Sequence, residues 1–153
     1  DREARLIHAV PLPEACAHGT FVAPRAYEIP SLATLTGEVF GPILHVLRFR
    51  AQDLDATIDA LNATGYGLTL GVHSRIDGAV EHIVGRVRAG NCYVNRNQIG
   101  AVVGVQPFGG EGLSGTGPKA GGPHYLARFA SERTVTINTT AAGGNASLLT
   151  LDD

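Results

Sequence analysis

Apolar and polar positions alternate in a regular order between about residues 40 and 95. Three short runs are rich in apolar and β-branched residues, which is typical of buried strands. Between these runs, apolar residues recur at i, i+4 and i+7, a spacing that places them on one face of a helix. The pattern predicts, in order, a strand over 42–49, a helix over 53–65, a strand over 68–73, a helix over 77–90 and a strand over 91–94.

The ends of both expected helices carry helix-boundary signals. Asp53 and Asp77 stand where N-caps are favoured, and Gly65 and Gly90 stand where helices commonly end. Strands that alternate with helices in this way predict a parallel sheet with right-handed crossovers. The expected fold class is therefore α/β.

Residues 100–122 break this order. Nine of these 23 residues are glycine and two are proline, which excludes a regular helix or strand. The same segment holds Val102, Val103, Val105 and Phe108, which we expect to be buried. A long apolar loop that needs many unusual backbone angles is more often functional than decorative.

The rest of the chain predicts smaller elements. A short helix is expected over about 125–129, and β-branched residues alternate over 134–140 in the manner of a strand. We expect a partial catalytic domain over 1–131, a strand segment over 132–140 and a small polar tail over 141–153.

Composition narrows the classes of function. Twelve basic and 14 acidic residues give a net charge of −2, and no basic stripe is present, so the sequence does not suggest nucleic-acid binding. No apolar run approaches the ~20 residues that a membrane-spanning helix needs. Cys16 and Cys92 lie far apart, and the six histidines lack metal-ligand spacing, so we expect no disulfide, no metal and a cytoplasmic location. The chain has no Met and begins with Asp1, which predicts that it is a piece of a longer polypeptide.

One motif matches a dinucleotide-binding fingerprint by letter. Residues 110–115 read Gly-Glu-Gly-Leu-Ser-Gly, and Glu132 follows about 20 residues later. The fingerprint works only between a strand and a helix N-terminus, whereas proline and glycine flank this segment on both sides. A loop that packs closely against a ligand or a neighbouring backbone is the favoured interpretation. A small independent nucleotide-binding domain remains a rival hypothesis, and it predicts that Gly112→Val abolishes NAD binding.

Two other segments carry candidate binding chemistry. Glu38 and Phe40 share one side of an extended segment, where a carboxylate could accept two hydrogen bonds from a vicinal diol beside an aromatic ring. A surface glutamate next to a core phenylalanine is the commoner explanation for these residues. At Gly100 and Ala101, small side chains leave backbone N–H groups accessible for an anion such as a substrate carboxylate. A tight turn is the commoner explanation there.

Taken together, these segments resemble the aldehyde dehydrogenase superfamily. Residues 38–42 look like its E-x-F-G-P motif, residues 90–95 its G-N-x-x-x-N strand, and residues 107–115 its P-F-G-G…S-G loop. Residues 99–104 resemble the substrate-anchor loop of the glutamate-semialdehyde (pyrroline-5-carboxylate) dehydrogenases. Residues 111–126 resemble the bifunctional proline-utilisation enzymes of bacteria.

The resemblance implies a fold and a set of roles. It implies the α/β parallel-sheet catalytic domain of the aldehyde dehydrogenase fold, in part, with a C-terminal oligomerisation strand and a homo-oligomeric enzyme. Glu38 would bind the nicotinamide ribose of NAD, and Phe40 would position the nicotinamide ring. The amides of Gly100 and Ala101 would hold the substrate carboxylate, and Phe108 would pack on the substrate's aliphatic chain.

The implied reaction is NAD-dependent oxidation of L-glutamate γ-semialdehyde to L-glutamate in proline catabolism. Neither Cys16 nor Cys92 matches the family's nucleophile, so no catalytic residue is expected in this chain, and the isolated piece is expected to be inactive. The missing N-terminal half of the enzyme is the expected partner. FAD is expected only if a proline dehydrogenase domain lies upstream. The alternative is a non-catalytic fragment that acts only in subunit assembly.

Overall fold

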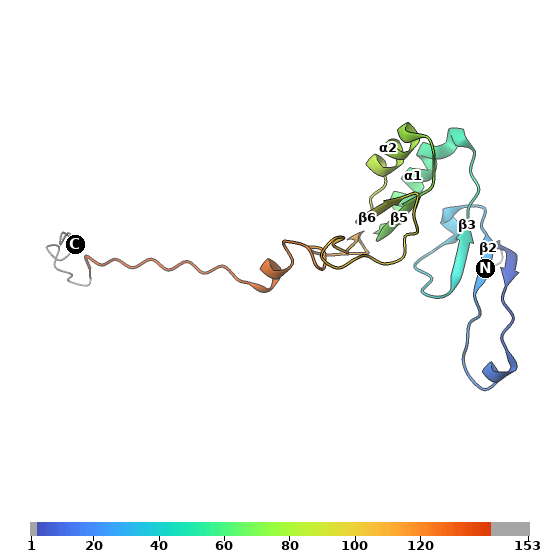
Figure 1. Ribbon diagram of the computed structural model, residues 1–153, viewed down its shortest axis with the longest axis horizontal. Coiled ribbons are helices and arrows are strands. Elements are labelled where there is room, and N and C mark those ends of the chain that lie inside the picture. The colour runs from blue at the N-terminus through green and yellow to red at the C-terminus, as the bar shows by residue number, and fades with distance from the viewer. Residues whose placement is uncertain (1–2, 142–153) are drawn as a thin grey trace.

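The computed structural model describes residues 3–141 of the 153-residue chain. Short strands and helices alternate along this part, as Figure 1 shows. The elements are β1 (Arg5–Ala9), η1 (Glu14–Cys16), β2 (Arg25–Glu28), η2 (Leu32–Thr34), β3 (Ile43–Val46), η3 (Ala51–Asp53), α1 (Leu54–Ala63), β4 (Tyr66–Gly67), β5 (Thr69–Val72), α2 (Asp77–Arg86), β6 (Asn91–Val94), β7 (Glu111–Gly112) and η4 (Leu126–Phe129).

The first sheet has the order β1-β2-β3. β1 runs antiparallel to β2, β2 runs parallel to β3, and the β1–β2 connection projects as a long arm (Figure 1). Glu28 of β2 links β1 to the segment that follows β3, because its carboxylate accepts hydrogen bonds from Arg5 and, at 3.1 Å, from Nε of Arg48. The hydrogen bond from Arg5 is the main reason that the pKa of Glu28 lies below its usual value.

The segment from α1 to β6 confirms the predicted alternation of helices and strands. β5 and β6 pair in parallel, and α2 forms the crossover that parallel neighbours require. Ile58 of α1 is buried, and the left-handed backbone of Gly65, with φ +78°, follows the helix as expected. The predicted α/β class is confirmed.

Three local expectations in this region are wrong. β3 does not join the sheet of β5 and β6, because within residues 3–141 it is hydrogen-bonded to β2, a strand that the pattern did not predict. The Asp53 carboxylate does not cap α1, because it accepts a 2.7 Å hydrogen bond from Nε of Arg50 instead. The second helix ends at Arg86 and not at Gly90, so Val87 lies outside α2, because its backbone is already extended, with ψ 128°.

The apolar core is small. Its buried apolar residues come from the first sheet and its flanks, from α1 and from the β5–β6 pair; they are Ala23, Ile29, Ile58, Val72 and Tyr93. Many large apolar side chains are exposed in this chain, including Phe40, of which 96% is accessible. Exposed apolar area of this extent is characteristic of surfaces that meet another surface.

The C-terminal part leaves the body of the molecule as an extended segment (Figure 1). The expected helix over 125–129 is present as the 3-10 helix η4. The expected strand over 134–140 has no strand partner within residues 3–141, and Val135 and Ile137 are exposed. Its role in oligomerisation stays a prediction. The predicted polar tail lies outside the described residues, except for Ala141.

Candidate functional site

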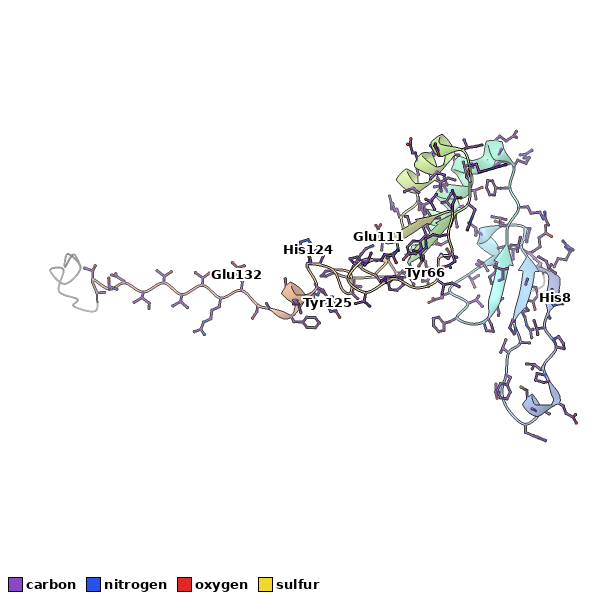
Figure 2. The ribbon with its side chains drawn as sticks, viewed as in Figure 1. His8, Tyr66, Glu111, His124, Tyr125 and Glu132 are labelled. Carbon is purple, nitrogen blue, oxygen red and sulfur yellow. The ribbon has the colours of Figure 1, made fainter. Side chains whose placement is uncertain are left out.

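The glycine-rich segment 100–122 forms a folded loop rather than a dinucleotide-binding turn. Inside the matched motif, β7 pairs antiparallel with β4, with Gly67 opposite Glu111. Figure 2 shows the side chains of Tyr66 and Glu111 beside this short ladder. No helix starts at the last glycine of the motif, so the geometry that would place a pyrophosphate on a helix N-terminus is absent from this loop. The rival hypothesis of a nucleotide-binding domain loses its support.

The glycines allow backbone segments to approach one another closely. A Cβ atom on Gly90 would lie 1.7 Å from the carbonyl oxygen of Gly109, and one on Gly115 would lie 2.2 Å from that of Gly110. Gly112 has φ +59°, a conformation that favours glycine. The favoured interpretation of this loop, close packing on neighbouring backbone, is confirmed.

A buried amide joins the loop to β6. Nδ2 of Asn91 donates to the carbonyl of Pro107 at 3.1 Å, and its Oδ1 accepts from the backbone N–H of Gly109 at 3.3 Å. Nζ of Lys119 donates to Oδ1 of the same Asn91 at 3.2 Å and to the carbonyl of Gly90. These contacts fix the backbone on both sides of Phe108.

The expected anion-binding backbone lies at the other end of this network. Gly100 has φ +67°, and its carbonyl accepts a hydrogen bond of 3.2 Å from the hydroxyl of Tyr93. Phe108, 37% exposed, forms a bridge with Ala120, in which each backbone N–H donates to the other's carbonyl. The structure therefore connects the candidate substrate residues Gly100 and Phe108 through β6. Ala101 follows Gly100 and is half-buried.

The expectation that Val102, Val103, Val105 and Phe108 are buried is wrong. Val102, Val103 and Val105 are 58%, 90% and 74% exposed. Local hydrogen bonds hold this tip, because the Gln106 side chain accepts from the N–H of Val102 at 3.0 Å and the Val102 carbonyl accepts from the N–H groups of Val105 and Gln106. The loop therefore holds its shape without burying its apolar tip.

The candidate cofactor residues occupy a different surface. A cleft of about 610 Å³ lies between the 32–39 segment and the α1–β5 region, and Glu38, His45, Leu70 and Ser114 are among its lining residues. The Glu38 carboxylate makes no hydrogen bond to any residue of the described chain, so both of its oxygens can accept from a diol. Phe40 is not among the lining residues, and its ring is almost fully exposed. The structure therefore brings Glu38 to the cleft but not Phe40, and the cofactor contacts of both residues stay predictions.

Titratable groups outside the cleft lining include the two cysteines and the Asp55–His82 pair on the helices. In the described chain, no group of three or more His, Cys, Asp or Glu side chains could hold a metal ion. No helix within residues 3–141 has the length and hydrophobicity needed to cross a membrane. Cys16 and Cys92 are free, and Cys92 is exposed. The hydrogen bond between Asp55 and His82 on the helices lowers the pKa of Asp55, and neither residue lines the cleft.

Three residues that hold the loop were not predicted from sequence as functional. Asn91 is a fixed letter of the G-N-x-x-x-N motif, but no role was assigned to it from the sequence, and Tyr93 occupies a variable position of the same motif. Lys119 is the only lysine of the chain and stands in its most glycine-rich segment, which is the one sequence signal that could have identified it.

The α/β fold and this loop are those of a known protein family. The model of the aldehyde dehydrogenase family matches residues 1–135, and the chain belongs to this family. Its sequence is 58% identical to the bifunctional protein PutA of Rhizobium meliloti over 125 residues, which cover 82% of this chain and 10% of that protein. It is 61% identical to PutA of Escherichia coli K12 over 115 residues, 75% of this chain and 9% of that protein. The chain thus spans about a tenth of the length of these relatives.

Solved structures agree with these relatives. A crystal structure of a mutant of Bradyrhizobium japonicum proline utilization A (PutA) superposes with a TM-score of 0.81 and 66% identity, over 92% of this chain and 14% of that chain. The 1-pyrroline-5-carboxylate dehydrogenase from Thermus with bound NAD superposes with a TM-score of 0.72 and 40% identity, over 84% and 24%.

Proposed function

We propose that this chain is the C-terminal part of the glutamate-γ-semialdehyde dehydrogenase module of a PutA-type enzyme of proline catabolism. The observation that carries the proposal is the identity of 58–61% to PutA proteins over 75–82% of the chain. In the net reaction, the aldehyde carbon loses a hydride to NAD and gains an oxygen from water. The products are the carboxylate, NADH and two protons.

The residues of this chain bind and orient rather than carry out the bond changes. The backbone N–H groups at Gly100 and Ala101 hold the substrate carboxylate, and Phe108 packs on its methylene chain. Glu38 accepts hydrogen bonds from the ribose of the cofactor, and Phe40 lies against its ring. NAD, when bound, supplies the hydride acceptor. The thiol nucleophile and the general base come from a part of the enzyme upstream of these residues.

The remaining partners follow from the same proposal. The exposed segment 132–140, which alternates apolar and polar residues, pairs with a second copy of the enzyme as an oligomerisation strand. Truncation of the full-length enzyme after Glu132, followed by light scattering, tests this point, because an unchanged oligomer would refute it.

Both cysteines are free, which agrees with a reducing cytoplasm.

The first experiment measures the native length of the polypeptide. An antibody against residues 90–126 is used on an extract of the source cells. A band several times larger than the 15.9 kDa of this chain supports the enzyme, provided that the purified protein forms NADH with glutamate semialdehyde. A single band near 15.9 kDa refutes it and favours the alternative, a fragment that acts only in subunit assembly.

A further inference from the structure

Asn91 is the one polar side chain that is buried within residues 3–141, and its hydrogen bonds are complete. An amide offers two N–H donors and two acceptor positions. The donors point at the carbonyl of Pro107 and, at 3.3 Å, at the hydroxyl of Tyr93, while the oxygen accepts from Gly109 and Lys119. A buried amide with all four positions occupied permits one arrangement of its neighbours, because any displacement leaves a polar group unpaired.

The network continues from Asn91 to the Gly100 carbonyl. The hydroxyl of Tyr93 receives the hydrogen bond from Asn91 and donates its own proton to Gly100. Its ring is buried, with 6% of its surface accessible, and the guanidinium carbon of Arg96 lies 4.4 Å from the ring centre. The tyrosine hydroxyl is therefore a fixed point between two loop segments.

Each end of this hydrogen-bond network lies beside a residue that the proposed function places in contact with the substrate. Asn91 holds Pro107 and Gly109 on either side of Phe108, and Tyr93 holds Gly100. A substrate with a carboxylate at one end and an aldehyde at the other has to match the separation of these two contacts. A displacement of either loop segment changes that match.

We propose that Asn91 and Tyr93, with Lys119 as their anchor, are positioning residues that set the separation between the carboxylate-binding backbone at Gly100 and the apolar surface of Phe108. They thereby select an aldehyde that carries a carboxylate a few bonds away. None of the three touches the substrate in this assignment. The inference rests on the proposed function for the identity of the substrate, but the positioning itself can be measured without activity.

Tyr93→Phe in the full-length enzyme tests the proposal most sharply, because it removes one oxygen and keeps the buried ring. The variant loses the hydrogen bonds to Asn91 and to Gly100, and loss of the one that reaches the Gly100 carbonyl predicts an about five-fold rise in the KM for glutamate semialdehyde and in the Kd for the product glutamate. The kcat and the KM for NAD should change less than two-fold. Equal changes in every constant, or none, would overturn the proposal, because a general loss of stability does not distinguish substrate from cofactor.

Hydrogen exchange of residues 98–110 provides a readout that is independent of the reaction. Faster exchange in Tyr93→Phe than in the unmodified enzyme is expected, and unchanged exchange overturns the proposal whatever the kinetics show. If exchange is faster but the unmodified enzyme neither oxidises glutamate semialdehyde nor binds glutamate, the proposed function fails while the positioning role stands.

Two further variants complete the experiment. Tyr27→Phe is the matched control, because it removes a tyrosine hydroxyl from β2 that makes no hydrogen bond within the described chain. It should leave all constants and the exchange of 98–110 unchanged. Asn91→Ser removes the centre of the network and should raise the KM for the semialdehyde more than Tyr93→Phe does. A smaller effect than that of Tyr93→Phe would contradict the central place given to Asn91.

Discussion

Substitution of Gly90 by alanine tests whether close backbone contact holds the glycine-rich loop on β6. The added Cβ would meet the carbonyl oxygen of Gly109 at 1.7 Å and the Cα of Gly110 at 2.8 Å. Real Cβ atoms essentially never lie within 3.0 Å of another heavy atom, so the backbone has to move by about 3.0 − 1.7 = 1.3 Å. Backbone atoms cannot rotate away as a side chain can, and the loop itself has to shift.

The cost follows from two contributions. Overpacking of a close contact costs about 1–3 kcal/mol, and a shift of this size breaks the 3.3 Å hydrogen bond from Gly109 to Asn91, which adds about 1 kcal/mol. We therefore expect the free energy of unfolding of this region to fall by about 2–4 kcal/mol. Urea unfolding of the full-length enzyme, followed together with the KM for glutamate semialdehyde, measures both the destabilisation and the displacement.

Gly85→Ala is the matched control. Gly85 lies inside α2, and a Cβ there has no heavy atom within 4 Å. Alanine is favoured over glycine within a helix by about 0.5–1 kcal/mol, so this variant should be slightly more stable, with an unchanged KM. The reasoning is refuted if the two variants unfold at the same urea concentration, or if Gly90→Ala leaves the KM for the semialdehyde unaltered.

Three further predictions concern the full-length enzyme. Glu38→Gln should raise the Kd for NAD about five-fold with the fold intact, since a neutral amide is a weaker acceptor than a carboxylate; unchanged NAD kinetics would count against the ribose contact. Phe108→Ala should raise the KM for glutamate semialdehyde about ten-fold through lost contact with two methylenes, and an effect on NAD alone would exclude this role. The pKa of Asp55 is lowered by hydrogen bonds from His82 and Arg86, so its contribution to stability is complete above the unfolded value of 3.8 and is lost as the pH falls through the lower folded value. Thermal unfolding of wild type and Asp55→Asn should therefore differ at pH 6 and converge in strong acid, and a difference that persists there would contradict the assignment.

The helices and strands between 43 and 94 could be predicted because their signals are local. The helical spacing that includes Ile58, and the glycine that ends α1, depend only on residues a few positions apart. The pairing of β5 with β6 follows from the helix between them. The partner of β3 could not be predicted in this way, because β2 lies about 18 residues upstream and its four residues, Arg25–Glu28, carry a weak strand pattern.

Individual residues of the candidate site were proposed from the sequence, but the hydrogen bonds that hold them in place were not. Glu38 and Gly100 were proposed from local chemistry and from motif letters, and Phe108 from motif letters alone; neither source carries information on what holds these residues. The groups that hold the loop are backbone carbonyls and one amide, and the hydrogen bonds from Lys119 to β6 span 28 and 29 residues. Composition and periodicity carry no information on contacts between residues that lie 28 or 29 positions apart in the sequence.

The exposure of the loop valines, which were expected to be buried, indicates how the loop is stabilised. Three valines at 58–90% exposure are costly in water unless another surface covers them. The same loop is fixed at both ends, by Tyr93 at Gly100 and by Asn91 at Pro107 and Gly109. A loop with fixed ends and an apolar tip loses little conformational entropy when a surface or ligand covers it, because its conformation is already set. Burial was expected from hydrophobicity alone, whereas the structure stabilises the loop through its polar ends and leaves its apolar side chains available for contact.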